Sequence, residues 1–452
     1  MAAWGRPVPE RCERFVRVLL LAAVAVALAH LGCDDTKSPD PSNGGPTATP
    51  VVADSAAPSP GRWRAYRTHQ YDAALTEEQR EEIKRLEALG YLSGVFEAPA
   101  ESGVLRHSPD RVRPGLNLYT SGHRAQAILM DMEGNVLHRW QHDFAAIWPD
   151  YPVSQKIKNG AFWRRVHLFE NGDLLAIFEG LGLIKLDRDS NLIWANSLRA
   201  HHDFDVTEDG RIHVLTREAR LEPDVDPQRP ISVDFITTLD AQGNELSHLS
   251  LLSALDDSNY AQIFRSRDRK HGDIFHTNSL SLLGPPPPGA PPEFAEGHFL
   301  VSMLWLDAIA VVDPAKNRVV WAHQGSFRTQ HDPNLLPNGN LLLFDNRGTK
   351  PHSRVLELEP RSGEIVWRYQ GSDAEPFYSE TCGTAQRLEN GNTLITESDR
   401  GRAIEVDAEG EVVWEFLSPF RAGEDGELIA TVMEMVRLPA DFARSWLAEA
   451  GD

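Results

Sequence analysis

Three histidines stand at matched places in this chain of 452 residues. His202 lies seven residues before the turn Asp209-Gly210, and His331 lies seven residues before Asn338-Gly339; an aspartate follows each histidine. His276 begins a similar segment between them. Converging imidazoles could bind a metal such as zinc through neutral nitrogens, or could perform nucleophilic and acid–base chemistry near neutral pH. A single histidine is more often structural, but three at matched places favour a functional site.

The elements that must position these histidines are encoded by a repeated phrase of an acid, a short turn and a tryptophan, usually followed by Asn-Gly or Asp-Gly. The clear copies are Asp131…Trp140, Asp187…Trp194, Asp313…Trp321, Glu359…Trp367 and Asp407…Trp414. A weaker copy begins at Asp240, where His248 replaces the tryptophan. A phrase repeated at intervals of some tens of residues predicts a repeat architecture.

Each copy has the composition of short strands joined by turns. The apolar run 309–312 and the return segment 318–321 flank the turn at Asp313, which predicts a hairpin. Asn338-Gly339 supplies the positive φ angles of a second hairpin turn. Two hairpins per copy would form one propeller blade.

Six copies predict an all-β, six-bladed β-propeller over residues 116–440, with the closing strand of the sixth unit near residues 430–436. We expect the tryptophans to pack between adjacent blades. Equivalent positions on neighbouring blades face one central channel, so the three histidines are expected to converge there. His202 shares the offset of His331, so His202 rather than His201 is expected to point inward.

The first 33 residues have the pattern of an export signal. A basic segment precedes an apolar run over residues 18–29, which is short for a bilayer span. Leu31-Gly32-Cys33 resembles the end of a bacterial lipoprotein signal, so lipidation of Cys33 is predicted. An ordinary cleaved signal and an uncleaved anchor are the alternatives. All three place the folded domain outside the cytoplasm, in the periplasm or cell envelope.

Two further segments precede the predicted propeller. Residues 34–61 are rich in Pro, Ser, Thr and Ala and are predicted to be a disordered linker. Residues 62–115 are expected to be a linker that contains an amphipathic helix over 75–89, because residues 76–79 have a capping-box pattern. This helix is expected to pack on the propeller. Residues 441–452 are expected to be a C-terminal tail.

Charge and cysteine content exclude several classes of function. The formal net charge of −21 argues against binding to nucleic acid or adsorption to anionic lipid. Of three cysteines, Cys12 lies in the signal and Cys33 is the lipidation candidate, which leaves Cys382 unable to pair within the mature chain. The residues beside Cys382 would not lower its pKa, so it is a poor nucleophile candidate.

The histidine segments resemble the arylsulfotransferase family of exported bacterial six-bladed propellers. The resemblance lies in Thr329-Gln330-His331-Asp332, in residues 344–346, and in the segments 200–204 and 275–279. It covers roughly residues 116–419. It implies transfer of a sulfuryl group from a phenolic sulfate ester to a phenol acceptor, without a nucleotide sulfate donor, a metal or another cofactor.

The resemblance also implies roles for individual residues. His331 would attack sulfur and become a sulfohistidine, whereas His202 and His276 would hold sulfate oxygens or protonate the departing phenolate. Asn278 would contact the substrate. Such covalent catalysis divides one transfer into two easier steps.

One segment departs from the family pattern. The family usually has an arginine soon after the strand that here reads 300–302, and this chain has Met303-Leu304-Trp305-Leu306 instead. An apolar residue such as Leu304 removes a bidentate oxyanion donor. Arg347 or Arg164 could substitute, and Arg164 stands at the His331 offset in the first unit. Without a substitute, the protein would bind a different ligand or lack sulfotransfer.

Two other classes of propeller share the acid–turn–tryptophan phrase. Quinoprotein-type propellers have eight blades and longer chains, so six copies weigh against that class. A non-catalytic, membrane-anchored scaffold that binds ligands or proteins through its rim loops is the main alternative. If the histidines bind a metal instead, chelation should abolish function.

Overall fold

The computed structural model describes residues 74–87, 92–151, 160–266, 272–325, 327–349, 352–372 and 375–447. The chain divides into two units, Met1–Asp54 and Ser55–Asp452, and all described residues belong to the second. The predicted signal with Cys33 and the predicted linker 34–61 lie outside the described residues. Among the described residues, no helix is both long and apolar enough to cross a membrane.

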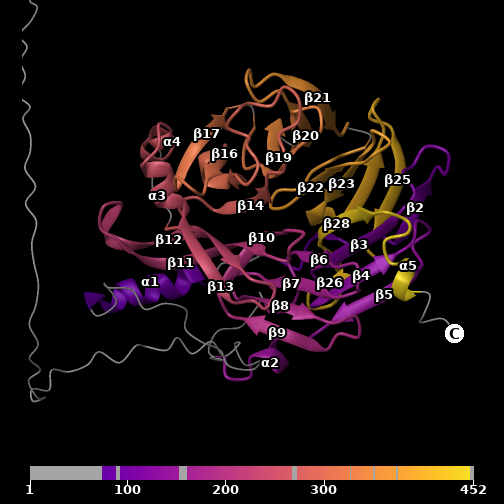
Figure 1. Cartoon of the computed structure of the whole chain (residues 1–452). Coiled ribbons are helices and arrows are strands. Elements are labelled where there is room, and N and C mark those ends of the chain that lie inside the picture. The colour runs from indigo at the N-terminus through magenta and orange to yellow at the C-terminus, as the bar shows by residue number, and fades with distance from the viewer. Residues whose placement is uncertain are drawn as a thin grey trace, which may run out of the picture. The chain divides into compact units, whose positions relative to one another are not determined.

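Six antiparallel sheets form six blades around a central channel (Figure 1). From the inner to the outer strand, blade 1 is β28 (Val432–Leu438), β3 (Leu116–Ser121), β4 (Gln126–Met130) and β5 (Val136–Gln141). Blade 2 is β6 (Val166–Leu168), β7 (Leu174–Phe178), β8 (Gly182–Leu186) and β9 (Leu192–Asn196). Blade 3 is β10 (Ala200–Val206), β11 (Ile212–Glu222), β12 (Asp226–Leu239) and β13 (Glu245–Ser250).

The other three blades follow in chain order. Blade 4 is β14 (Thr277–Leu282), β15 (Phe299–Met303), β16 (Ala308–Asp313) and β17 (Arg318–Gln324). Blade 5 is β18 (His331–Leu335), β19 (Leu341–Thr349), β20 (His352–Leu358) and β21 (Ile365–Gln370). Blade 6 is β22 (Thr384–Arg387), β23 (Thr393–Glu397), β24 (Arg402–Val406), β25 (Val412–Leu417) and a fifth strand, β2 (Gly103–His107).

The remaining elements are short. A small sheet joins β1 (Gly94–Glu97), β27 (Leu428–Ala430) and β26 (Arg421–Ala422). The helices are α1 (Glu77–Glu87), α2 (Phe144–Ile147), α3 (Leu251–Asp256), α4 (Ala261–Arg265) and α5 (Arg444–Leu447), with 3₁₀ turns η2 (Leu304–Leu306) and η3 (Ser398–Arg400). Apolar residues on facing sheets are buried against one another, so the core is distributed between blades.

The prediction of an all-β, six-bladed propeller is confirmed, but the grouping of hairpins into blades was wrong by half a unit. The hairpin around Asp313 is β16–β17 of blade 4, whereas the Asn338-Gly339 hairpin is β18–β19 of blade 5. Each sequence copy therefore spans the outer half of one blade and the inner half of the next. The turn sequences show where hairpins form, but they do not show which hairpins belong to the same sheet.

The ring is closed by strands from both ends of the described chain. β28 was expected to complete the sixth unit, but it pairs with β3 and is the inner strand of blade 1. β2 pairs with β25 at the outer edge of blade 6. The stretch 62–115, expected to be a linker, therefore contributes β1 and β2 to sheets. The expected C-terminal tail contributes α5, whose Trp446 packs edge-on against Trp140 at 5.8 Å between ring centroids.

The predicted N-terminal helix is observed as α1. Thr76 and Gln79 form a capping box: Thr76 N donates to Gln79 Oε1 at 2.8 Å, and Gln79 N donates to Thr76 Oγ1 at 3.2 Å. Leu86 is buried, and Gln79 Nε2 donates to the backbone oxygen of Gln228 in β12. The helix packs on blade 3 of the propeller, as expected.

The acidic residue of the repeated phrase stabilises a turn by accepting backbone hydrogen bonds. An aromatic ring from the preceding blade contacts this turn. Asp187 Oδ1 accepts the backbone N–H groups of Asp189 and Asn191 at 2.9 and 2.8 Å. Trp194 of blade 2 then donates its indole N–H to the backbone oxygen of Ala241, which follows Asp240 in blade 3. The expected packing of tryptophan between adjacent blades is present at this interface.

Strand register corrects two members of the repeat. In blade 1, His138 rather than Trp140 pairs with Leu129, the residue two positions before the turn acid Asp131. The residue that faces the next blade pairs with the residue two positions before the turn acid, as Trp194 pairs with Lys185 and Trp414 pairs with Glu405. In blade 3 this residue is Ser247, which pairs with Thr238. His248 was expected in the tryptophan position, but it stacks on Phe235 of its own blade at 4.0 Å. The prediction was wrong by one residue, which reverses the face of a strand.

Candidate active site

The three histidines lie at the start of inner strands, where the sheet is locally distorted. The register shifts between residues 200 and 204 in β10, 277 and 279 in β14, and 331 and 334 in β18. His202 and His276 have positive φ angles of 55° and 49°. Positive φ in a residue with a Cβ atom is uncommon. Such distortions re-aim side chains, and here they recur in three consecutive blades.

The aspartates that follow two of the histidines connect neighbouring blades. Asp203 Oδ2 accepts the backbone N–H of Leu280 in blade 4 at 2.9 Å. Asp332 Oδ2 accepts the backbone N–H of Ala385 in blade 6 at 3.0 Å. The two residues of each His-Asp pair therefore have different roles. The aspartate binds the backbone of another blade, whereas the histidine side chain belongs to the candidate site.

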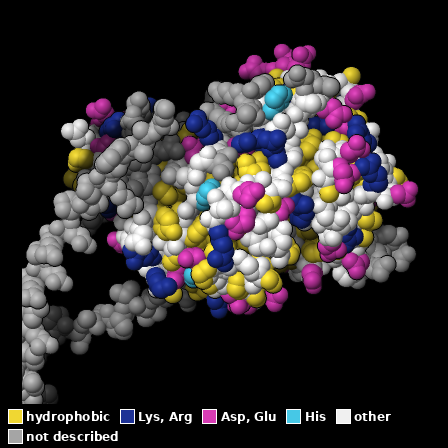
Figure 2. Space-filling model, turned by 90° about the horizontal axis from the view of Figure 1, so that it is seen from above, with side chains coloured by type: hydrophobic (Ala, Val, Ile, Leu, Met, Phe, Trp, Pro, Cys, Tyr) yellow, Lys and Arg dark blue, Asp and Glu magenta, His cyan; other side chains and the backbone are white. Residues whose placement is uncertain are grey.

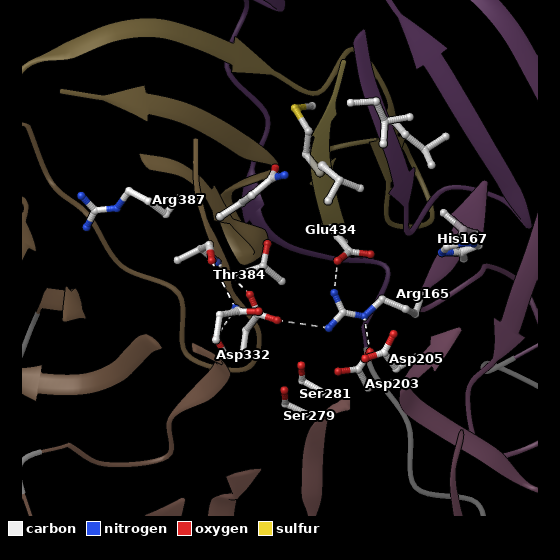
Figure 3. A pocket seen from close by; sticks show the side chains of 18 of the residues that line it. Arg165, His167, Asp203, Asp205, Ser279, Ser281, Asp332, Thr384, Arg387 and Glu434 are labelled. Carbon is white, nitrogen blue, oxygen red and sulfur yellow. Dashed lines mark hydrogen bonds and ion pairs between the residues drawn. The ribbon is translucent and has the colours of Figure 1, made fainter. Parts of the chain in front are cut away.

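A buried arginine joins these aspartates across the channel (Figure 3). Arg165 forms ion pairs with Asp203 at 2.8 Å, with Asp332 at 3.3 Å and with Glu434 of β28. The four side chains come from blades 1, 2, 3 and 5. Burial raises the pKa of Asp203, which the charge of Arg165 opposes.

The four charged residues also line a channel cavity of about 690 Å³, together with Ser279, Ser281 and Thr384. None of the three candidate histidines lines this cavity. Along an extended strand, successive side chains take different directions, so the aspartates can face the cavity while the histidines face another layer.

His331 is held as a neutral imidazole with one nitrogen available. It is 1% exposed, and burial together with the charge of Arg164 lowers its pKa to about 3. Its Nδ1 lies 2.7 Å from Asn346 Oδ1, while the Asn346 amide nitrogen donates to the backbone oxygens of Ser379 and Cys382. Because Asn346 Oδ1 accepts only, Nδ1 carries the proton, and Nε2 retains its lone pair without a protein hydrogen-bond partner among the described residues.

The other two histidines contact each other and lie in a chain of titratable groups. His202 Nε2 lies 3.2 Å from His276 Nε2, and His202 Nδ1 lies 2.8 Å from His201 Nδ1. His276 Nδ1 lies 2.5 Å from Asp273 Oδ2. Burial lowers the pKa of His276, but Asp273 outweighs burial, so its pKa is raised overall. Burial and the charge of His276 lower the pKa of His202. Of the two histidines, His276 therefore binds a proton more readily.

Two buried arginines supply positive charge to the same region. Arg164 is 2% exposed, and its charge lowers the pKa of both His202 and His331. Arg217 lies 3.8 Å from Glu179 Oε1. Burial lowers the pKa of His201 and His202, and the charge of Arg217 lowers both further. The predicted candidate Arg164 is therefore close to the histidine cluster.

The structure places the other predicted substrate-binding residues, Asn278 and Arg347, differently. Asn278 is buried and donates from Nδ2 to the backbone oxygen of Gln330 at 2.9 Å, so its amide donor links blades 4 and 5. The side chain of Arg347 lies outside the described residues. Leu304, at the place of the expected arginine, is buried in η2, whereas Trp305 is 43% exposed and its ring lies 5.9 Å from that of His276. An aromatic side chain thus replaces the cationic one at the edge of the site.

Among the residues that the structure describes, Glu179, His201 and His202 are close enough to hold a metal ion, since their candidate ligand atoms all lie within 4.8 Å of one another. Arg217 contacts Glu179, and Arg164 acts on His202, so two positive charges oppose a cation here. The Cys382 thiol is buried, which raises its pKa to about 11 and suits a structural role.

Sequence reasoning missed several side chains of the site. Glu179 accepts the backbone N–H of His202 at 2.8 Å, and Asp234 accepts the backbone N–H of Thr277 at 2.8 Å. Glu179 lies between two strands of blade 2, and Asp234 lies within β12. Only Asp273 had a local signal, since it precedes His276 by three residues.

The surface gives less information than the interior. On the face shown in Figure 2, Lys and Arg side chains are interspersed with Asp and Glu, and apolar side chains lie among them. Charges of both signs on one face are typical of a solvated surface.

The fold and the histidine cluster define a class: six-bladed propellers with a buried, polar site at the start of their inner strands. Residues 165–419, more than half of the chain, match the family described as "Arylsulfotransferase (ASST)". The chain belongs to this arylsulfotransferase family, which supports a sulfotransferase-like function. No curated protein matches the sequence.

Several solved structures are similar in fold at low sequence identity. A protein of unknown function from Bacteroides caccae is 14% identical with a TM-score of 0.46, covering 72% of this chain and 98% of its own. A streptogramin B lyase is 11% identical with a TM-score of 0.40, covering 74% and 93%. The WD40 propeller domain of Doa1 is 13% identical with a TM-score of 0.40, covering 77% and 96%. Similarity at this level carries no functional conclusion.

Proposed function

We propose that the protein transfers a sulfuryl group from a phenolic sulfate ester to a phenol through a sulfohistidine at His331. The observation that carries the proposal is the state of the His331 imidazole. Asn346 fixes the proton on Nδ1, and burial keeps the ring neutral, so Nε2 has an available lone pair. A neutral, oriented nitrogen is what a nucleophile at sulfur requires.

In the first step, His331 Nε2 forms a bond to sulfur, and the bond between sulfur and the phenolic oxygen breaks. The phenolic oxygen leaves with the electron pair and takes the proton of His276. Asp273 suits His276 to this task by keeping the imidazolium protonated. The sulfated His331 ring carries a positive charge, which the Asn346 oxygen stabilises through Nδ1–H.

In the second step, the acceptor phenol attacks the same sulfur atom. Neutral His276 takes the acceptor's proton, and the bond between sulfur and His331 Nε2 breaks, which returns both histidines to their starting states. The non-bridging sulfate oxygens gather charge in both steps; the positive charge of Arg164 is present in both, and protonated His276 adds to it in the first. Arg164 thus serves in place of the missing family arginine, and Trp305 can pack against an aryl ring.

The test is transfer from 4-nitrophenyl sulfate by the purified domain, with and without phenol. We expect nitrophenolate release to depend on phenol and phenyl sulfate to accumulate in equal amount by mass spectrometry. Release at the same rate without phenol would indicate a sulfatase that uses water. No release by a folded protein would contradict the proposal and favour a ligand-binding propeller.

Replacing Asp273 by asparagine should lower kcat by about 10- to 100-fold at neutral pH, because His276 loses the charge that keeps it protonated. His276 is active as an acid below its raised pKa, so wild-type activity falls as pH rises through that pKa. In Asp273→Asn the pKa is lower, and the fall should begin at lower pH. The measurement is kcat against pH, with Asp256→Asn, an exposed partner of Arg265, as the control. An unchanged profile in Asp273→Asn would contradict the assigned role.

A further inference from the structure

One interface between blades lacks the ring that the others have. The position that faces the next blade is aromatic in five blades: His138, Trp194, Trp321, Trp367 and Trp414. In blade 3 it is Ser247. A hydroxymethyl group thus stands where an indole or imidazole stands elsewhere, at the interface between blades 3 and 4.

Four of the five rings make the same polar contact. A ring nitrogen donates to the backbone oxygen of the residue that follows the turn acid of the next blade. The pairs are His138 to Arg188 at 2.7 Å, Trp194 to Ala241 at 3.1 Å, Trp367 to Ala408 at 3.0 Å and Trp414 to Met132 at 2.9 Å. The molecule therefore contains its own template for a planar ring with one donor between two blades.

The Ser247 interface contains a cavity of about 1030 Å³, lined by residues of both blades. Leu249 and Thr238 line it from blade 3, and Phe299 and Pro314 line it from blade 4. Pro314 follows the turn acid Asp313 in a turn one residue longer than those that accept the four rings, and its backbone oxygen accepts the N–H of Asn317 at 3.4 Å. A carbonyl oxygen has two lone pairs, so this oxygen can accept one further hydrogen bond. The cavity combines apolar side chains such as Leu249 and Phe299 with polar ones such as Arg211 and Glu208. Apolar side chains and a carbonyl acceptor fit an aromatic ring that carries an N–H or O–H group.

We propose that this cavity, the blade 3–4 slot, binds a small aromatic molecule with one hydrogen-bond donor, of the indole or phenol class. The ring lies between Leu249 and Phe299, and its donor contacts the Pro314 oxygen, by analogy with the ring donors of His138, Trp194, Trp367 and Trp414 at four other interfaces. His213 stands at one wall, edge-on to Phe299 at 4.9 Å, with its Nδ1 3.0 Å from Thr238 Oγ1.

The slot is separate from the histidine site. It is lined by the β10–β11 turn of blade 3 and the β16–β17 turn of blade 4. In an antiparallel blade, these turns lie at the opposite end from the β7–β8 and β15–β16 connections, which carry Glu179 and Trp305. Binding here does not depend on the proposed function.

The test uses 5-fluoroindole as the probe, with affinity measured from ¹⁹F line broadening. Wild type and Ser247→Ala, which leaves the slot open, should bind alike. Ser247→Trp fills the slot with the ring found at the other interfaces, so binding should weaken by about tenfold or more, and the melting temperature should rise. Equal binding by Ser247→Trp, or no binding by wild type, would overturn the proposal.

A second measurement locates the ligand without relying on a variant. Crystals of the wild-type protein soaked with 5-bromoindole should show an anomalous bromine peak between Phe299 and Leu249. A peak only beside Trp305 and His276 would show that the ring binds at the histidine site alone and would overturn the slot. The position of the bromine peak tests the proposed binding site even if Ser247→Trp does not fold.

Discussion

His331→Ala is expected to reduce phenol-dependent release of nitrophenolate by on the order of 10³-fold or more, because the variant lacks the atom that accepts the sulfuryl group. The fold should persist, since the ring contributes one side-chain hydrogen bond, to Asn346, and one contact with the backbone oxygen of Thr329. The measurement is the initial rate with and without phenol, together with the melting temperature. His323→Ala, which removes a half-buried ring of β17, is the matched control.

Added imidazole is expected to restore activity to His331→Ala. The His331→Ala variant leaves a space lined by Asn346, and a free imidazole placed there can accept the sulfuryl group. Release should then increase with imidazole concentration in His331→Ala and stay constant in wild type. Full activity of His331→Ala without imidazole would show that another group attacks sulfur, and the sulfohistidine would be excluded.

The fold could be predicted from the sequence because one structural device is repeated. An acid at a tight turn and a ring seven or eight residues later encode both the hairpin and the contact with the next blade. The blade boundaries could not be predicted, since turn chemistry is local and sheet pairing is not. The Ser247 position shows the same limit, because one residue of register decides which side chain faces the neighbouring blade.

The sequence could likewise predict only some residues of the candidate site. His202 and His331 could be paired by their equal offsets from a turn, because repeated units place equivalent residues around one channel. Asn346 lay in a segment that carries the family resemblance, but its contact with His331 could not be predicted, and Glu179 could not be found, since both reach the histidines from other strands and loops. The charge state of His276 depends on Asp273, which is near in sequence but has no recognisable motif. The catalytic roles of these residues stay predictions until the variants are measured.

The contacts of Arg165 explain why two aspartates beside the histidines tolerate burial. The guanidinium is the partner of Asp203, Asp332 and Glu434, whose side chains are 6%, 15% and 9% exposed. Removing one member of a buried charge network costs more than the network contributes, because the remaining charges are left without compensation. Arg165 of blade 2 thus joins its own blade to blades 1, 3 and 5 and supports the backbone of both His202 and His331.

Arg165→Leu is expected to lower the free energy of unfolding by about 3–5 kcal/mol, measured by urea denaturation at neutral pH. Arg111→Leu, which removes an exposed pair with Asp407, should leave it unchanged within error. Burial already raises the pKa of Asp203 and the charge of Arg165 opposes that rise, so in Arg165→Leu the folded-state pKa of Asp203 rises further above its unfolded value. Stability tied to a raised pKa is present at low pH and lost as pH rises, so the deficit against wild type should shrink near pH 4 and grow toward pH 8.

The double variant Arg165→Leu/Glu434→Gln distinguishes the loss of stability caused by uncompensated charge from the loss caused by the changed side-chain shape. It removes one positive and one negative charge from the same contact, so it should recover part of the stability that Arg165→Leu loses. Glu434→Gln alone leaves Arg165 with Asp203 and Asp332 and should be milder than Arg165→Leu. If Arg165→Leu unfolds at the same urea concentration as wild type at every pH, then Asp203 and Asp332 are stabilised by their backbone N–H partners alone. The blades would then be joined by hydrogen bonds to Leu280 and Ala385, and the arginine would contribute only to the charge of the channel.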